Sequence, residues 1–154
     1  MEEVGADFEM EQQKMVLKNS VEYQSDKQVV LYKPEYKEQY VGMHSTDVYW
    51  TAEKVIDALD RFRIILAIEN DMVVGYLDIT HKYKENEPYD IFVKEEYRGK
   101  GYGKAMLVKA IELNKPNAMM LLVDIDNLPA IAMYEKLGFV KSENENNMTA
   151  HVSL

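Results

Sequence analysis

Apolar and polar residues alternate along the chain in patterns that predict strands and helices from residue 28 onward. Residues 28–33 are rich in β-branched and aromatic side chains and predict a strand, which Pro34 ends. Proline fits the first turn of a helix, and the apolar positions that follow it keep a spacing of about 3.6 residues: Tyr36, Tyr40 and Met43. A second helix is predicted after Thr51, with Val55, Ile56 and Leu59 on its buried face.

The middle of the chain predicts a β-hairpin and a third strand. Residues 63–68 and 72–80 are apolar segments on either side of the turn sequence Glu69-Asn70-Asp71. The polar residues 81–88 predict a loop, and residues 89–93 predict the next strand. These strands follow one another without long helical connections, which favours an antiparallel arrangement.

The last third of the chain predicts helices that alternate with strands. Residues 101–113 have the apolar spacing of a helix, and residues 118–123 form a nearly continuous apolar run, typical of a strand buried on both faces. A short helix is predicted over 128–137, because Gly138 suits a left-handed C-cap. A final hairpin is predicted from the segments 139–142 and 148–152.

Residues 1–27 fit this plan poorly. They carry charged residues and glutamine with one apolar patch over 15–17, and their sequence faintly resembles the closing hairpin. We therefore expect an N-terminal arm over 1–27, with the tail of an upstream domain as the alternative, and one domain over 28–154.

Composition excludes several classes of function. The chain of 154 residues has no cysteine, and its three histidines, His44, His81 and His151, show no metal-ligand spacing, so neither disulfides nor a metal is expected. The net charge of −9 argues against a nucleic-acid partner. No apolar run reaches the roughly 20 residues that span a bilayer, and the acidic N-terminus is unlike a signal peptide. We expect a cytoplasmic protein without a membrane partner.

Residues 98–104 carry the most informative motif. Glycines in this loop allow backbone conformations closed to other residues and let N–H groups approach a ligand closely. The helix that begins there adds unpaired N–H donors and the positive end of its dipole, and the cations add charge. The motif predicts a phosphate site formed by Arg98, Gly99, Lys100, Gly101, Tyr102, Gly103 and Lys104.

Two phosphate-binding folds compete for this loop. The spacing of a Walker loop is absent. A dinucleotide fold is the serious alternative, because Gly101 and Gly103 follow a strand and Asp124 ends the next strand, where a ribose-binding acid would lie. However, Met106 stands at the third glycine position of that motif.

Two segments, 90–107 and 122–140, together resemble the GNAT superfamily of acetyl-CoA-dependent N-acetyltransferases. The family's Arg/Gln-x-x-Gly-x-Gly/Ala motif matches Arg98, Gly101 and Gly103. Its Asn-x-x-Ala-x-x-x-Tyr-x-x-x-Gly-Phe motif matches Asn127, Ala130, Tyr134, Gly138 and Phe139. The resemblance implies an α/β (α+β) fold, with a central mixed, mostly antiparallel sheet of six to seven strands flanked by about four helices.

The resemblance also implies a division of labour around acetyl-CoA as co-substrate. Backbone groups of Phe92 and Val93 would pair with the pantetheine arm, loop 98–104 would hold the pyrophosphate, and Asn127 would bond the pantetheine amide. Tyr134 would protonate the departing thiolate.

The base that deprotonates the acceptor is less clearly indicated. Asp90 is the first candidate, because it lies on the strand beside the expected thioester site. Glu87, Asp78 and His81 are alternatives.

The expected activity is transfer of an acetyl group to a primary amine of a small molecule or a peptide. The alternative is a non-catalytic acyl-CoA-binding module, or one half of a tandem acetyltransferase. Aromatic residues in the segment that often forms the acceptor wall in this family could line the acceptor site or belong to the core: Tyr36, Tyr40, Tyr49 and Trp50. Whether the chain forms a homodimer or follows an upstream domain stays open.

Overall fold

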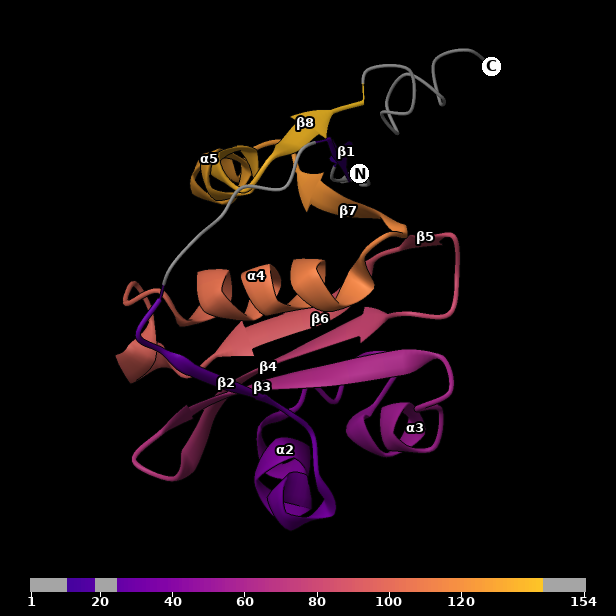
Figure 1. Ribbon diagram of the computed structural model, residues 1–154. Coiled ribbons are helices and arrows are strands. Elements are labelled where there is room, and N and C mark those ends of the chain that lie inside the picture. Colours follow the sequence, from indigo (N-terminus) through magenta and orange to yellow (C-terminus); the bar gives the residue numbers. More distant parts are fainter. Residues whose placement is uncertain (1–10, 19–24, 143–154) are drawn as a thin grey trace, which may run out of the picture. The chain divides into compact units, whose positions relative to one another are not determined.

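The chain folds into two compact units, residues 23–118 and residues 1–22 with 119–154. The computed structural model describes residues 11–18 and 25–142 (Figure 1). Within these residues, no helix is long and apolar enough to cross a membrane.

The larger unit is built on an antiparallel sheet with the strand order β2-β3-β4-β6. Its strands are β2 (Gln28–Leu31), β3 (Phe62–Glu69), β4 (Met72–Thr80) and β6 (Pro88–Val93), and a two-residue strand, β5 (Glu85–Asn86), precedes β6. Asn70 and Asp71 both have positive φ, which is the geometry of a tight hairpin turn between β3 and β4. The predicted hairpin is therefore confirmed.

Helices cover both faces of this sheet. Figure 1 shows α4 (Tyr102–Asn114) on one face, and α2 (Lys37–Met43) and α3 (Ala52–Ile56) on the other. The short helix η1 (Pro34–Tyr36) leads into α2, and Thr51 caps α3 by accepting a hydrogen bond from the Lys54 N–H at 3.5 Å. Leu59 does not belong to the buried face of α3: it lies beyond the helix and is 41% exposed.

Gly75 lets the sheet pack closely at β4. A Cβ added there would lie 2.8 Å from the Phe92 carbonyl oxygen and 3.3 Å from the side chains of Met106 and Val93. The first distance is far below van der Waals contact, and its partner is backbone of β6, which cannot turn aside. Close pairing of β4 and β6 therefore requires glycine at position 75.

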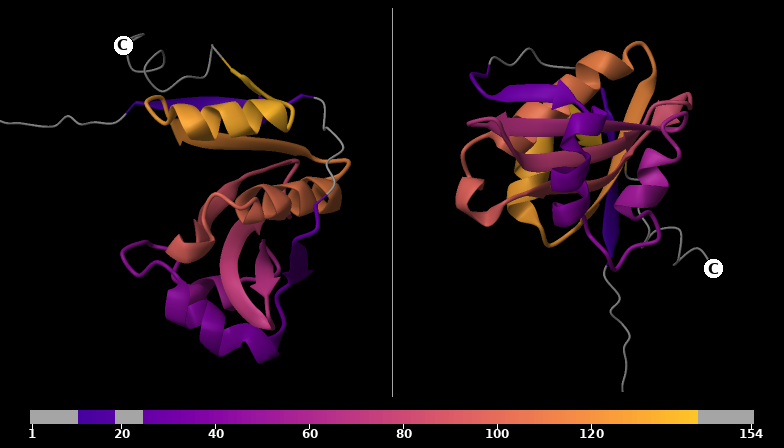
Figure 2. Two further views of the ribbon diagram at one scale, coloured as in Figure 1. Left: turned by 90° about the vertical axis from the view of Figure 1, so that its left-hand side faces the viewer. Right: turned by 90° about the horizontal axis from the view of Figure 1, so that it is seen from below.

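The smaller unit contains the antiparallel strands β1 (Gln12–Leu17), β7 (Ala118–Asp124) and β8 (Phe139–Lys141), with β1 between the other two. Figure 2 shows α5 (Leu128–Lys136) lying along these strands. Gly138 has a φ of 106°, so the predicted left-handed C-cap of α5 is confirmed.

One expectation about β7 is wrong. Its residues alternate between buried and exposed, since Leu121 is 2% exposed and Leu122 is 41% exposed, so the strand is not buried on both faces. The second strand of the predicted closing hairpin, 148–152, lies outside the described residues.

The predicted fold class is confirmed, with four α-helices in the described residues and mostly antiparallel strands. The strand count differs: the described residues hold eight strands in two sheets instead of six to seven in one. Two strands were not predicted. One is the short β5, and the other is β1, which belongs to the N-terminal segment 1–27. The dinucleotide alternative is wrong, because the strands before the glycine loop form an antiparallel sheet and not an alternation of parallel strands and helices.

We expect Gly75→Ala to destabilise the protein by about 1–3 kcal/mol, because the new methyl group overlaps backbone of β6. The measurement is the urea midpoint of unfolding. Gly42→Ala in α2 is the matched control, since open space surrounds that position and alanine favours a helix by up to about 1 kcal/mol. Equal midpoints for the two variants would contradict the packing argument.

Candidate active site

The glycine loop has backbone conformations that its sequence requires. Gly99 and Gly101 have φ values of 75° and 96°, in the left-handed region that favours glycine, and Gly101 is the N-cap of α4. Gly103 is different, because it lies in the first turn of α4. A Cβ there would make ordinary contacts of 3.9 and 4.0 Å with Val93 and Ile91. The prediction that all three glycines serve an unusual backbone conformation is thus wrong for Gly103.

The start of α4 presents backbone donors. The Ala105 N–H bonds the Gly101 carbonyl at 3.0 Å, while the N–H groups of the preceding first turn have no acceptor within the helix. Gly101 has no side chain that could cap them. This arrangement, together with the helix dipole, favours an anionic ligand.

The side chains of the loop differ in their directions. The exposed Arg98 donates from Nε to the Val93 carbonyl at 2.7 Å, and its guanidinium lies 5.4 Å from the centre of the Phe92 ring. Lys100 lies over the Tyr97 ring, in η2 (Glu95–Tyr97), with 5.8 Å between Nζ and the ring centre. Tyr102 is buried and its hydroxyl donates to Glu69, so only its backbone can serve a ligand at the loop.

Strand β6 carries Phe92 and Val93 at the edge of the larger sheet, opposite Tyr76 and Gly75 of β4. As an edge strand in that sheet, it has backbone groups on its outer side that take no part in pairing with β4. The pairing shifts by one residue between the Asp78–Asp90 pair and the Ile79–Pro88 pair. This bulge leaves Tyr89 unpaired beside Asp90, a device that proteins often use to direct side chains near a site.

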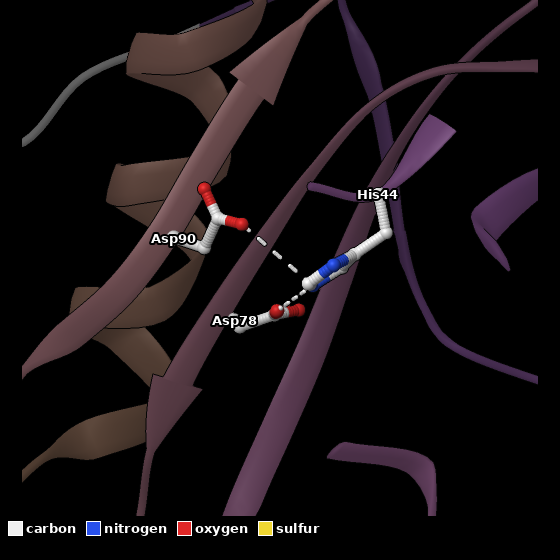
Figure 3. A group of neighbouring side chains, drawn as sticks. All are labelled: His44, Asp78 and Asp90. Carbon is white, nitrogen blue, oxygen red and sulfur yellow. Dashed lines mark hydrogen bonds and ion pairs between the residues drawn. The ribbon is translucent and has the colours of Figure 1, made fainter. Parts of the chain in front are cut away.

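Asp90 belongs to a hydrogen-bonded cluster on the face of the sheet that α2 covers (Figure 3). Its Oδ2 accepts a hydrogen bond from the Tyr76 hydroxyl at 2.8 Å and lies 3.7 Å from His44 Nε2. His44 Nε2 in turn lies 2.5 Å from Asp78 Oδ2, and the Tyr40 hydroxyl donates to Asp78 Oδ1 at 2.7 Å. The His44 and Asp78 side chains are each 1% exposed and that of Asp90 is 22% exposed, so Asp90 is the member that solvent reaches.

Burial and hydrogen bonding shift the pKa values within this cluster. Burial raises the pKa of the Asp78 carboxyl, although hydrogen bonds from His44 and Tyr40 oppose the shift. Burial acts against the charged form of His44, but its bonds to Asp78 and to the Ser45 carbonyl outweigh this and raise its pKa. Burial also raises the pKa of the Tyr40 and Tyr76 phenols, which therefore stay neutral donors.

Three members of the cluster offer atoms that could bind a metal. The candidate ligand atoms of His44, Asp78 and Asp90 all lie within 4.8 Å of one another. His44 Nε2 and Asp78 Oδ2 lie 2.5 Å apart, the distance of two atoms that share a proton. Two atoms that each bind one metal ion at about 2.0–2.2 Å are farther from each other than this. The geometry therefore favours a proton over a metal between them.

The structure separates the candidates for the base. Asp78 is buried and bonded within the cluster, whereas the His81 ring bonds the Leu59 carbonyl at 3.0 Å. Glu87 is partly buried on the loop before β6. His44 was missed by the sequence analysis. The available signal was Asp78, a charged residue within the apolar run of β4, because a buried carboxylate requires a partner.

The smaller unit carries the other two predicted residues. Asn127 caps α5, with its Oδ1 accepting a hydrogen bond from the Ala130 N–H at 3.3 Å. The Tyr134 ring packs against Phe139 with 6.0 Å between centres, and burial raises the pKa of its phenol. Within the described residues its hydroxyl has no hydrogen bond. Tyr134 is therefore a neutral phenol with an uncommitted proton.

The aromatic residues of the segment 36–50 have different surroundings. Tyr40 is fully buried in the core, and Tyr36 and Trp50 are partly buried against it. Tyr49 is 72% exposed. The core interpretation therefore holds for Tyr40, and Tyr49 is the member most accessible to a ligand.

Curated relatives match short parts of the chain. A mycothiol acetyltransferase of Paenarthrobacter aurescens (strain TC1) is 42% identical over 62 residues, which cover 38% of this chain and 19% of that protein. The first three curated relatives are matched over 19–36% of their own lengths. The chain thus spans well under half of these proteins.

Solved structures share the fold at low sequence identity. A protein of the GNAT family from Novosphingobium aromaticivorans DSM 12444 has a TM-score of 0.70 at 17% identity, over 86% of this chain and 60% of its own. The PaiA N-acetyltransferase of Thermoplasma acidophilum, solved in complex with coenzyme A, has a TM-score of 0.56 at 18% identity, over 73% of this chain and 88% of its own.

The sequence profile described as the acetyltransferase (GNAT) family matches residues 29–139, well over half of the chain. This segment holds the antiparallel sheet, the glycine loop, Asp90, Asn127 and Tyr134. The chain therefore belongs to the acetyltransferase (GNAT) family.

Proposed function

We propose that this chain transfers an acetyl group from acetyl-CoA to a primary amine. The observation that carries the proposal is the glycine loop at the start of α4, where Gly99 and Gly101 adopt the left-handed conformation. The loop presents backbone donors beside the cations Arg98 and Lys100. A pyrophosphate is the part of acetyl-CoA that such a site would bind.

The remaining residues fit the other parts of acetyl-CoA. The outer edge of β6 at Phe92 and Val93 offers backbone groups for the amides of the pantetheine arm, as an added strand would use them. The Asn127 amide keeps its N–H donors for the same arm, because its oxygen caps α5. The coenzyme A complex of the PaiA neighbour supports this assignment through the shared fold.

The chemistry needs two proton transfers. Acetyl-CoA supplies a thioester whose acyl carbon an amine can attack. Asp90 would take the proton that an ammonium group must lose first, because its side chain is partly exposed and both of its bonds to other side chains end on one oxygen. Tyr134 would give its proton to the sulfur as the carbon–sulfur bond breaks, and its raised pKa keeps that proton available.

A second candidate function is binding of acyl-CoA without catalysis. The short match to the curated relatives favours this second function, because the parts of those proteins outside the match could carry the catalytic residues. The two functions share the loop and differ in the need for Tyr134 and Asp90.

We expect calorimetric titration to show binding of acetyl-CoA and of desulfo-CoA, but not of NAD. Gly101→Ala should weaken coenzyme A binding about tenfold or more, because alanine is strained at the φ of 96° found there and would displace the N–H groups at the start of α4. Gly103→Ala is the matched control on the same loop: its Cβ would meet only ordinary contacts with Val93 and Ile91, so binding and thermal stability should change little. Unaltered binding by Gly101→Ala would argue against a phosphate at this loop.

We expect Tyr134→Phe to lower kcat by about 10²-fold or more while leaving the affinity for coenzyme A unchanged, because the phenol acts only on the leaving sulfur. The measurement is steady-state release of free thiol from acetyl-CoA with a panel of primary amines. Tyr83→Phe removes an exposed phenol in the larger unit and serves as the control. A wild-type protein that binds coenzyme A but turns over no amine would support the binding module.

A further inference from the structure

The buried pair His44–Asp78 holds a proton whose presence follows from hydrogen-bond geometry. His44 Nδ1 lies 2.9 Å from the Ser45 carbonyl oxygen, which can only accept, so Nδ1 carries a proton. Nε2 lies 2.5 Å from Asp78 Oδ2, and this contact also needs a proton between its two atoms. The pair therefore holds one proton more than a neutral imidazole beside a carboxylate.

This extra proton lies close to Asp90. His44 Nε2 is 3.7 Å from Asp90 Oδ2, the oxygen that also accepts from the Tyr76 hydroxyl. Ser45 links His44 to Tyr76. Its carbonyl accepts from the His44 ring, and its N–H donates to the Tyr76 hydroxyl at 3.1 Å. Figure 3 shows the second oxygen of Asp90 directed away from the His44 ring.

The charges of the cluster sum to a definite value. With the shared proton, His44 and Asp78 together are neutral and the carboxylate of Asp90 leaves a net charge of −1. The titratable groups that face His44 are Tyr40 from α2, Tyr76 and Asp78 from β4, and Asp90 from β6. Among them, only Asp90 is exposed to more than a trace of solvent.

We propose that His44 and Asp78 are positioning residues for Asp90: the proton they retain keeps His44 Nε2 an N–H group beside the inner oxygen of Asp90 and leaves the outer oxygen to receive a cationic amine. The part played by the amine rests on the proposed function, whereas the retained proton does not. The substrate class follows from the charge, because a net charge of −1 beside the partly exposed Asp90 complements an ammonium group.

The retained proton makes stability depend on pH in a definite direction. A histidine in the unfolded chain loses its proton near pH 6.5, while the folded pair keeps it to higher pH, because the pKa of His44 is raised. The stabilisation is therefore complete below about pH 6.5 and is lost as the pH rises toward the folded value. Between these limits the folding equilibrium constant falls about tenfold per pH unit.

We expect this fall as the pH rises above 6.5 in the wild type and in His81→Gln, but not in His44→Gln, when unfolding by urea is measured at each pH. His81→Gln makes the same chemical change at a histidine outside the cluster. Parallel curves for the wild type and His44→Gln would overturn the retained proton.

Nuclear magnetic resonance tests the same claim on the wild type, so it does not depend on a variant that folds. The ring nitrogens of His44 should both stay protonated to a pH above 6.5, whereas loss of the Nε2 proton near pH 6.5 would overturn the proposal. The ¹³C carboxyl signal of Asp90, assigned by its loss in Asp90→Asn, should shift in the wild type over the pH range in which His44 loses its proton, because Asp90 Oδ2 lies 3.7 Å from His44 Nε2. In His44→Gln this shift should be absent, and an Asp90 signal that does not respond to His44 would refute the link between them.

Activity separates this inference from the proposed function. If the wild type acetylates amines, His44→Gln should raise KM for the amine more than it lowers kcat, with the affinity for coenzyme A unchanged. An unchanged KM for the amine would show that His44 does not act through Asp90. If no amine is acetylated while the resonances behave as expected, the proposed function fails and the retained proton stands.

Discussion

The burial of Asp78 near the end of β4, an inner strand of the sheet, is the constraint on which the larger unit depends. A carboxylate removed from water is tolerated only where hydrogen bonds and charge replace the lost solvent. Here Tyr40 and His44, both supplied by α2 and its C-cap, meet the two oxygens of Asp78. The position of α2 on the sheet is therefore coupled to a polar contact within an otherwise apolar core. The same His44 ring also lies 3.7 Å from Asp90.

The residues of the proposed reaction are divided between the two units of the chain. The larger unit supplies the phosphate loop and Asp90, and the smaller unit supplies Asn127 and Tyr134. The proposed groups of the larger unit lie at the loop before α4 and on β6, and those of the smaller unit lie at the N-cap and in the last turn of α5. The loop and α4 belong to one continuous strand–loop–helix segment, which explains why their local sequence is so informative.

Strand β1 was not predicted from the pattern of apolar and polar residues. Residues 12–17 carry few apolar side chains, and only the patch at 15–17 indicated order. They nevertheless form a strand between β7 and β8, with Met15 fully buried. Whether such a segment forms a strand depends on its packing against the neighbouring strands, and that context is not visible in its own sequence.

Features that depend only on residues close together in the chain could be predicted from the sequence alone. The sequence predicted the strands and helices of residues 28–141 apart from β5, the hairpin turn at Asn70, the left-handed Gly138 and the loop conformation of Gly99 and Gly101. These follow from local backbone geometry. Only the tertiary structure decided that Gly103 has an ordinary conformation and that His44 meets Asp78, 34 residues away. A buried charge in the sequence shows that a partner must exist, but the partner's identity depends on how helix and sheet pack.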